Sequence, residues 1–159
     1  MTATAASLAP DEALLLREDC DGIARLTMNR PKAYNAMSVE LMQAMLAELQ
    51  AIDRDPSIFC VVIEGAGKGF CAGHDLRQLK ENPSTAFREK TFGLCSQVMQ
   101  AIIGLRQPVI AKVHGIATAA GCQMVASCDL ALAQADARFG TPGVNIGLFC
   151  STPMVALSR

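Results

Sequence analysis

The sequence carries no surplus of positive charge and no cluster of basic residues. Its 14 lysines and arginines are balanced by 15 aspartates and glutamates, which gives a net charge of −1. Sequence-independent binding of nucleic acid needs a concentrated positive face, so we expect no nucleic-acid partner. The chain also lacks an apolar run close to the roughly 20 residues that span a bilayer, and we expect no membrane partner.

Spacings typical of metal ligands are missing as well. The seven cysteines are scattered, several of them inside apolar runs, and no Cys-x-x-Cys pair or Cys/His cluster occurs. We therefore expect no bound metal, and the odd number of scattered cysteines indicates a reduced, cytoplasmic protein. Cys71 is either a reactive thiol or a small side chain packed behind its loop, and the packing interpretation is preferred.

The first twelve residues are small and rich in threonine and alanine. They lack the basic segment and apolar core of a secretory signal, and the first arginine is Arg17, which argues against a mitochondrial presequence. We interpret residues 1–12 as a disordered leader. Residues 13–159 are then one domain, because a chain with 51% hydrophobic residues at this length can bury a single core.

Apolar periodicity and turn residues predict an α/β domain. Residues 14–17 and 23–28 flank an Asp-Gly turn, which predicts an antiparallel hairpin. A helix that begins after Ser38 and runs to Asp53 then leads to a buried strand at residues 59–63. A polar connection follows Leu76. The later pattern predicts a helix over residues 85–105, buried strands at 109–113 and 130–133, a short helix from Ala119, and a last helix beginning at Thr152 with Pro153.

Two loops rich in glycine and alanine follow the buried strands at 59–63 and 109–113. The glycines of residues 65–76 allow the backbone to turn its amides toward a ligand. Residues 117–123 enter a short helix, whose first N–H groups are unpaired and favour negative charge. Together the two loops can form an oxyanion hole. The first loop has neither the glycine spacing of a dinucleotide site nor the Gly-Lys-Ser/Thr of a P-loop.

Four segments resemble the crotonase superfamily, the enoyl-CoA hydratase and isomerase family. They lie in the family's order at residues 30–36, 70–76, 108–115 and 119–129. The resemblance implies an α/β fold of the crotonase-like (ClpP/crotonase) kind, a spiral of ββα units. It covers the N-terminal three-fifths of the family domain, so the C-terminal helical region would be missing. Because family members form trimers or hexamers, the resemblance also implies a homo-oligomer.

The resemblance implies a role as well. Family members bind acyl-CoA thioesters in fatty acid and lipid metabolism, with coenzyme A as part of the substrate and no separate cofactor. Carried over by position, the backbone amides of Ala72 and Ala120 would stabilise a thioester enolate. The implied coenzyme A contacts are Lys32, Tyr34, Ala36, Ala72, His74, Asp75, Leu76 and Ala120.

The carboxylates of the hydratase branch have no counterpart in this chain. The two positions that match its catalytic glutamates hold Gln123 and Gly143. A carboxamide forms hydrogen bonds but does not exchange a proton near neutral pH, so Gln123 can orient a water without activating it. His74 is the best remaining acid-base candidate, because histidine titrates near neutral pH. The alternative is a hydrogen-bonded structural histidine.

Three hypotheses therefore stay open, and they differ on whether the chain is an enzyme. The first is a hydratase or isomerase with weak or displaced acid-base chemistry. The second is another crotonase-type enzyme, such as a decarboxylase or thioesterase. The third is a non-catalytic acyl-CoA-binding regulator of lipid metabolism. Carboxylates placed at positions 123 and 143 would distinguish them, because a large gain in hydration would show an intact pocket.

Overall fold

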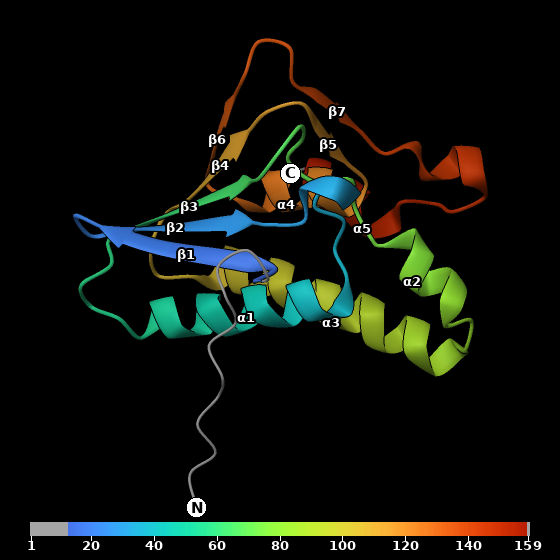
Figure 1. The fold of residues 1–159 in the computed structure, drawn as a ribbon, viewed down its shortest axis with the longest axis horizontal. Helices are drawn as coiled ribbons and strands as arrows, with labels where there is room; N and C mark the ends of the chain where they lie inside the picture. The colour runs from blue at the N-terminus through green and yellow to red at the C-terminus, as the bar shows by residue number, and fades with distance from the viewer. Residues whose placement is uncertain (1–12, 159) are drawn as a thin grey trace, which may run out of the picture.

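The computed structural model describes residues 13–158, which form a five-stranded sheet with long helices against one face (Figure 1). The predicted leader, residues 1–12, lies outside the described residues. The strand order is β1-β2-β3-β4-β6. No helix in residues 13–158 combines the length and the apolar character needed to cross a membrane.

The sheet begins with the predicted hairpin. Strands β1 (Leu15–Cys20) and β2 (Ile23–Met28) pair antiparallel. Asp21 and Gly22 form the turn with φ of 51° and 78°, the left-handed values that a tight hairpin turn requires. The predicted alternation in β2 is confirmed, since its inward side chains are fully buried: Ala24, Leu26 and Met28.

Three further strands follow β2 in parallel. They are β3 (Cys60–Gly65), β4 (Val109–Val113) and β6 (Leu130–Ala133). The carboxyl ends of parallel strands meet at one edge of a sheet, which is where ligands bind in many α/β folds. The two loops predicted to form an oxyanion hole both leave the sheet at this edge.

Two helices cover the inner face of the sheet. Ser38 caps α1 (Val39–Asp53), because its hydroxyl accepts a hydrogen bond from the Leu41 amide at 3.3 Å. Helix α3 (Thr85–Gly104) packs along α1. The core lies between these helices and the sheet, and its fully buried members include Leu41, Met45, Leu49, Ile52, Val61, Ile63, Val98 and Val109.

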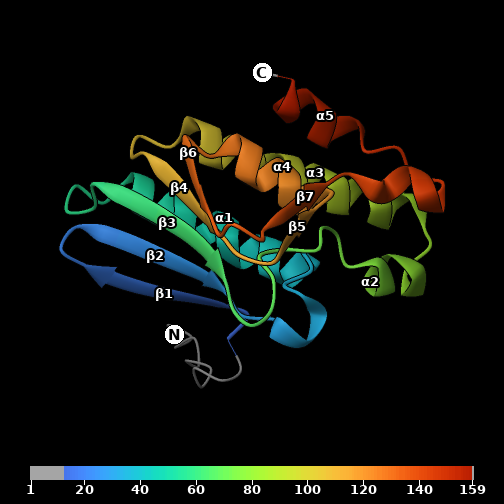
Figure 2. The ribbon, with the colours of Figure 1, turned by 90° about the horizontal axis from the view of Figure 1, so that it is seen from above.

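A second layer extends from the carboxyl edge of the main sheet (Figure 2). Strands β5 (Ile116–Thr118) and β7 (Arg138–Gly140) pair in parallel, and α4 (Ala120–Ser127) follows β5 directly. The chain ends with α5 (Ser151–Leu157), which packs on α4. Short 3-10 turns cover Pro31–Ala33 and Pro142–Ile146. This arrangement of a mixed sheet with packed helices is an α/β fold, as predicted.

Two sequence predictions need correction. The polar connection after Leu76 contains a helix, α2 (Leu76–Glu81), because the Asp75 carboxylate caps it by accepting from the amides of Arg77 and Gln78. Strand β6 forms, but it is not buried. It lies at the edge of the sheet, and Leu130 and Leu132 are 61% and 65% exposed.

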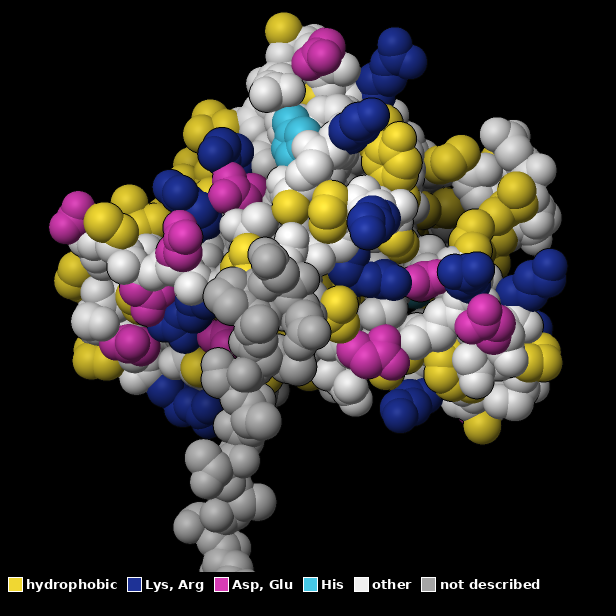
Figure 3. All heavy atoms as spheres, in the orientation of Figure 1, with side chains coloured by type: hydrophobic (Ala, Val, Ile, Leu, Met, Phe, Trp, Pro, Cys, Tyr) yellow, Lys and Arg dark blue, Asp and Glu magenta, His cyan; other side chains and the backbone are white. Residues whose placement is uncertain are grey.

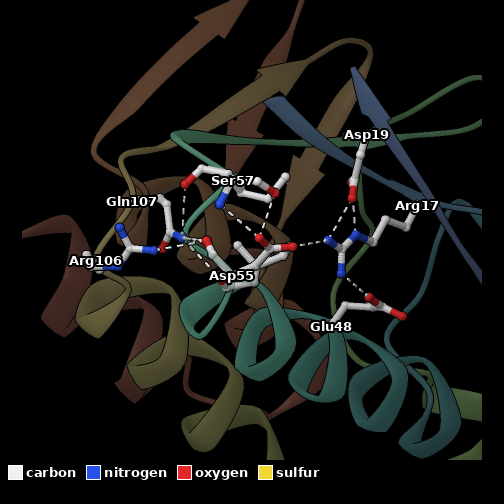
Figure 4. Close-up of polar contacts among 9 residues, drawn as sticks. Arg17, Asp19, Glu48, Asp55, Ser57, Arg106 and Gln107 are labelled. Carbon is white, nitrogen blue, oxygen red and sulfur yellow. Dashed lines mark hydrogen bonds and ion pairs between the residues drawn. The ribbon is translucent and has the colours of Figure 1, made fainter. Parts of the chain in front are cut away.

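A polar cluster joins the helices to the sheet at the end of α1 (Figure 4). Gln107 donates from Nε2 to the carbonyl oxygen of Ile52 at 2.8 Å and also reaches those of Asp55 and Ile58, at 3.4 and 3.3 Å. Arg17 forms ion pairs of 2.8 and 3.0 Å with Asp19 and Glu48. These contacts lie far from the loop edge, so we assign them a structural role.

Candidate active site

The two predicted loops meet at the carboxyl edge of the sheet. The Thr118 amide donates to the Cys71 carbonyl oxygen at 2.9 Å, and the Cys71 amide donates to the Ile116 carbonyl oxygen at 3.1 Å. The approach is close enough to require glycine at position 121, where a Cβ would lie 2.3 Å from the Cys71 carbonyl oxygen. The prediction that these loops lie side by side is therefore confirmed.

The first predicted oxyanion donor, Ala72, is already occupied. Its amide donates to the Tyr34 carbonyl oxygen at 2.9 Å. Two residues farther along, the His74 amide has no acceptor among the described residues. The reason is that His74 is paired with Met37 as in a parallel sheet. The Met37 amide donates to the Gly73 carbonyl oxygen at 2.7 Å, and the Met37 carbonyl oxygen accepts from the Asp75 amide at 3.2 Å. In a parallel ladder the intervening N–H points to the opposite side, so that of His74 is free.

The second predicted donor, Ala120, is available. It is the first residue of α4, and its amide has no acceptor among the described residues. Ala119 bends the chain before it with φ 49° and ψ −119°, a strained conformation for a residue with a Cβ. A Cβ built on Gly73 would lie 3.3 Å from the Ala120 nitrogen, so this amide is next to the His74 segment.

Both free amides belong to residues that line one cavity of about 250 Å³. Its other walls are mainly apolar and come from α3 and the start of α5: Phe92, Cys95, Leu148, Phe149, Cys150, Ser151, Thr152 and Pro153, together with Ala119. A small apolar cavity with convergent amide donors can hold an acyl group whose carbonyl oxygen carries developing negative charge.

The His74 side chain is not a group that titrates near neutral pH. Its ring lies edge-on to that of Phe92, with the centroids 4.9 Å apart, and Nε2 is buried without a hydrogen-bond partner. Burial lowers the pKa of His74 to about 4, because the charged ring would lose its hydration. The imidazole is therefore neutral at pH 7, which corrects the acid-base expectation.

Asn35 holds the first loop in place, and sequence reasoning missed it. Its side chain is fully buried, and Nδ2 lies 2.9, 2.8 and 3.1 Å from the carbonyl oxygens of Ala66, Gly69 and Phe70. Oδ1 accepts from the Arg30 amide at 2.9 Å. The signal available in the sequence was an asparagine, a residue that tolerates positive φ, and φ here is 54°.

Asp75, one of the implied coenzyme A contacts, is a capping carboxylate. Arg30 donates to Asp75 Oδ2 at 2.7 Å, and it also donates to the Ala36 carbonyl oxygen. Burial raises the pKa of the Asp75 carboxyl, but the hydrogen bond and charge of Arg30 outweigh this and keep the pKa below its ordinary value. Asp75 thus stays ionised at neutral pH and is committed to structure.

The remaining predicted coenzyme A contacts, apart from the loop and helix residues described above, fall into two groups. The side chains of Lys32, Tyr34 and Leu76 are exposed near the loop edge and are free to meet a ligand. Ala36 is buried, and its carbonyl oxygen is engaged by Arg30, so it offers no free polar group.

The two positions that match the hydratase glutamates differ in whether a larger side chain could be placed there. Gln123 lies in α4, and its Oε1 accepts from the Thr152 hydroxyl at 3.0 Å. At Gly143 a Cβ would lie 2.3 Å from the Leu148 carbonyl oxygen. A side chain at 143 does not fit without a backbone shift. Only position 123 can therefore test the effect of a carboxylate.

The thiol of Cys71 is packed, not reactive. It is fully buried and donates to the Asn35 carbonyl oxygen at 3.3 Å. Burial raises its pKa to about 12, so the thiolate is scarce at neutral pH. Within residues 13–158 no group of three or more histidine, cysteine or acidic side chains is arranged to hold a metal ion.

A profile of the enoyl-CoA hydratase/isomerase family matches residues 18–157. Enoyl-CoA hydratase domain-containing protein 3, mitochondrial, from Danio rerio is 42% identical over 146 residues, which are 92% of this chain and 50% of that protein. The short-chain-enoyl-CoA hydratase of Clostridium acetobutylicum is 38% identical over 128 residues, covering 79% of this chain and 48% of that protein.

Solved structures agree with this assignment. The enoyl-CoA hydratase of Mycobacterium smegmatis superposes with a TM-score of 0.91 at 54% identity, covering 93% of this chain and 58% of that one. Human enoyl-CoA hydratase domain-containing protein 3 superposes with a TM-score of 0.89 at 40% identity, covering 92% and 58%.

The comparisons overturn the prediction of a cytoplasmic protein. The vertebrate relatives are named as mitochondrial proteins. That prediction relied on scattered cysteines and on a missing early arginine, and neither feature defines a compartment.

The chain spans about half the length of the curated relatives it matches. The match nevertheless extends over nearly all of the chain, in sequence and in structure. This chain therefore belongs to the enoyl-CoA hydratase/isomerase family, within the crotonase superfamily.

Proposed function

We propose that this chain binds acyl-CoA thioesters, with the thioester oxygen held between the backbone amides of His74 and Ala120. The observation that carries the proposal is that both residues line one apolar cavity while neither amide has an acceptor among residues 13–158. An unpaired amide in an apolar site is costly unless a ligand accepts its hydrogen bond. A thioester carbonyl supplies that acceptor, and the cavity takes the acyl group.

The coenzyme A moiety would then lie outside the cavity, along the exposed side chains of Lys32, Tyr34 and Leu76. This placement uses one cation and two apolar surfaces, which suits a phosphorylated nucleotide with an extended arm. Such thioesters belong to fatty acid and lipid metabolism, and we propose that the chain acts there.

We further propose that enoyl-CoA hydration is very weak. The carboxamide of Gln123 does not exchange a proton near neutral pH, and position 143 is a glycine without a side chain. The pKa of His74 is about 4, far below neutral pH. An acid-base group typically contributes about 10²- to 10⁴-fold to the rate, whereas an amide donor stabilises charge without delivering a proton. Acyl-CoA binding without hydration is the outcome that this set of groups supports.

The test removes one amide hydrogen, and thermal unfolding checks that the variant folds. Ala120 is the first residue of α4, a position at which a proline keeps the later hydrogen bonds of the helix, so Ala120→Pro deletes the N–H donor. Thr85→Pro makes the matched change at the first residue of α3. Crotonyl-CoA binding is measured by calorimetry, and infrared spectroscopy follows the thioester carbonyl stretch.

We expect the carbonyl stretch of bound crotonyl-CoA to shift to lower frequency in the wild type and in Thr85→Pro. Ala120→Pro should lose most of the shift and bind on the order of tenfold more weakly, the worth of about one hydrogen bond. No measurable binding to the wild type would overturn the proposal. Hydration at or above about 10 s⁻¹, typical of enzymes in general, would overturn the claim of weak turnover.

We also propose that the chain forms homo-oligomers, as trimers or hexamers. Support comes from apolar side chains exposed along its C-terminal third: Leu130, Leu132, Phe139, Val144, Ile146 and Phe149. Figure 3 shows hydrophobic side chains gathered over β7 and the following 3-10 turn. Contiguous apolar surfaces of this kind usually mark interfaces. Light scattering at micromolar concentration tests the proposal, and a monodisperse monomer would refute it.

A further inference from the structure

The cavity proposed to hold the acyl group shares a lining residue, Thr152, with a second cavity. The second cavity has a volume of about 500 Å³ and lies between α3, α4 and α5. The walls of the second cavity include apolar side chains from all three helices, among them Met99, Ile103, Ala126 and Val155.

A hydrogen bond joins Thr152, which lines both cavities, to Gln123, which lines the second. The Thr152 hydroxyl donates to Gln123 Oε1 at 3.0 Å and so joins the first turn of α5 to the middle of α4. Gln123 lines the second cavity and is only 7% exposed. This contact is made by two side chains, so substitution can remove it.

We propose that Thr152, paired with Gln123, forms a boundary between the two cavities and so sets the length of acyl chain that the site accepts. The inference depends on the proposed acyl-CoA binding. With its thioester oxygen at the amides of His74 and Ala120, the chain would fill the first cavity. A volume of about 250 Å³ is that of about eight water molecules at roughly 30 Å³ each, so it holds on the order of eight non-hydrogen atoms. A longer chain must pass Thr152.

Passage of a longer acyl chain into the second cavity is unfavourable in the wild type, because the chain would separate Thr152 from Gln123. The carboxamide of Gln123 is nearly buried, and an alkyl chain offers it no hydrogen bond in return. With the boundary open, the groove beyond it is apolar enough to accept further methylenes. Each methylene removed from water then strengthens binding by about fourfold.

Thr152→Ala removes both the hydroxyl and the methyl group, which opens the boundary from α5. Thr152→Ser keeps the hydroxyl that bonds Gln123. Thr141→Ala is the matched control, because it makes the same chemical change at a residue that lines neither cavity. Gln123→Ala opens the boundary from α4 and provides the test if Thr152→Ala does not fold. Thermal unfolding checks each variant.

The assay measures the dissociation constants of butyryl-, octanoyl-, dodecanoyl- and palmitoyl-CoA, each below its micelle concentration. In the wild type, Thr152→Ser and Thr141→Ala, affinity should rise to octanoyl-CoA and fall for dodecanoyl-CoA. Thr152→Ala or Gln123→Ala should strengthen dodecanoyl-CoA binding by at least about tenfold relative to butyryl-CoA, since several methylenes become buried.

The outcomes separate the two proposals. If the wild type binds butyryl-CoA but Thr152→Ala and Gln123→Ala keep the wild-type length profile, the boundary is refuted while the proposed function stands. A wild type that binds all four chain lengths equally well also refutes the boundary. If no acyl-CoA binds the wild type, the proposed function itself fails, and the boundary fails with it.

Discussion

Replacement of Asn35 by alanine should strongly destabilise the fold. The side chain is fully buried, and its two N–H groups are shared among three carbonyl oxygens while Oδ1 accepts from the Arg30 amide. Three hydrogen bonds at about 1 kcal/mol each are lost. Alanine at φ 54° adds roughly 1 kcal/mol of backbone strain. The expected loss is about 3 to 5 kcal/mol.

Two further variants divide this loss into its parts. Asn35→Gly loses the same hydrogen bonds but adopts positive φ without strain, so it should be about 1 kcal/mol more stable than Asn35→Ala. Asn35→Asp keeps the shape, yet it turns a carboxylate oxygen toward three carbonyl oxygens. The folded-state pKa of that aspartate should rise above about 3.9. Its stability relative to wild type should therefore fall as pH rises through the folded-state pKa.

Urea unfolding followed by circular dichroism gives the free energies. Asn82→Ala is the control, because Asn82 is exposed and its side chain donates one hydrogen bond, to the Gln78 carbonyl oxygen at 3.0 Å. That control should lose less than about 1 kcal/mol. A loss below about 1 kcal/mol for Asn35→Ala, or wild-type stability for Asn35→Asp at pH 7, would refute the assignment of Asn35 as the residue that holds the loop.

Three other predictions concern the same region. The pKa of His74 is about 4 in the folded chain and about 6.5 in the unfolded chain. As the pH drops, the unfolded state binds the proton first, so the free energy of unfolding falls. Between pH 7 and pH 5 this free energy should fall by about 2 kcal/mol more in the wild type than in His74→Gln. Gly121→Ala should lower the free energy of unfolding by about 1 to 3 kcal/mol, because the new Cβ meets the Cys71 carbonyl oxygen. Gly93→Ala, at a position in α3 with open space around it, should raise this free energy by about 0.5 to 1 kcal/mol, as measured by urea unfolding. Asp75→Ala should lose about 2 to 4 kcal/mol with the α2 cap and the Arg30 partner, and Asp75→Asn, which keeps the cap, should lose clearly less; equal losses would show that the ion pair alone matters.

Local chemistry predicted much of the main sheet and its helices. The Asp-Gly turn and the alternation of β2 predicted the hairpin, and Ser38 predicted the start of α1. These features depend on residues close together in the chain, so they are visible in a sequence. The position of the two loops was also predictable, because parallel strands bring their carboxyl ends to one edge.

Sequence patterns alone were enough to identify the family, most of the strands and helices, and the missing carboxylates at Gln123 and Gly143. Which amides are free depends on tertiary contacts, because the Ala72 amide donates to Tyr34 and His74 is paired with Met37. The tertiary structure likewise decided the pKa of His74, which depends on burial beside Phe92, and the meeting of Thr152 with Gln123. Each of these results from contacts between segments far apart in the chain, and the properties of a hydrogen-bonding or ionisable group depend on such neighbours as much as on its own chemistry.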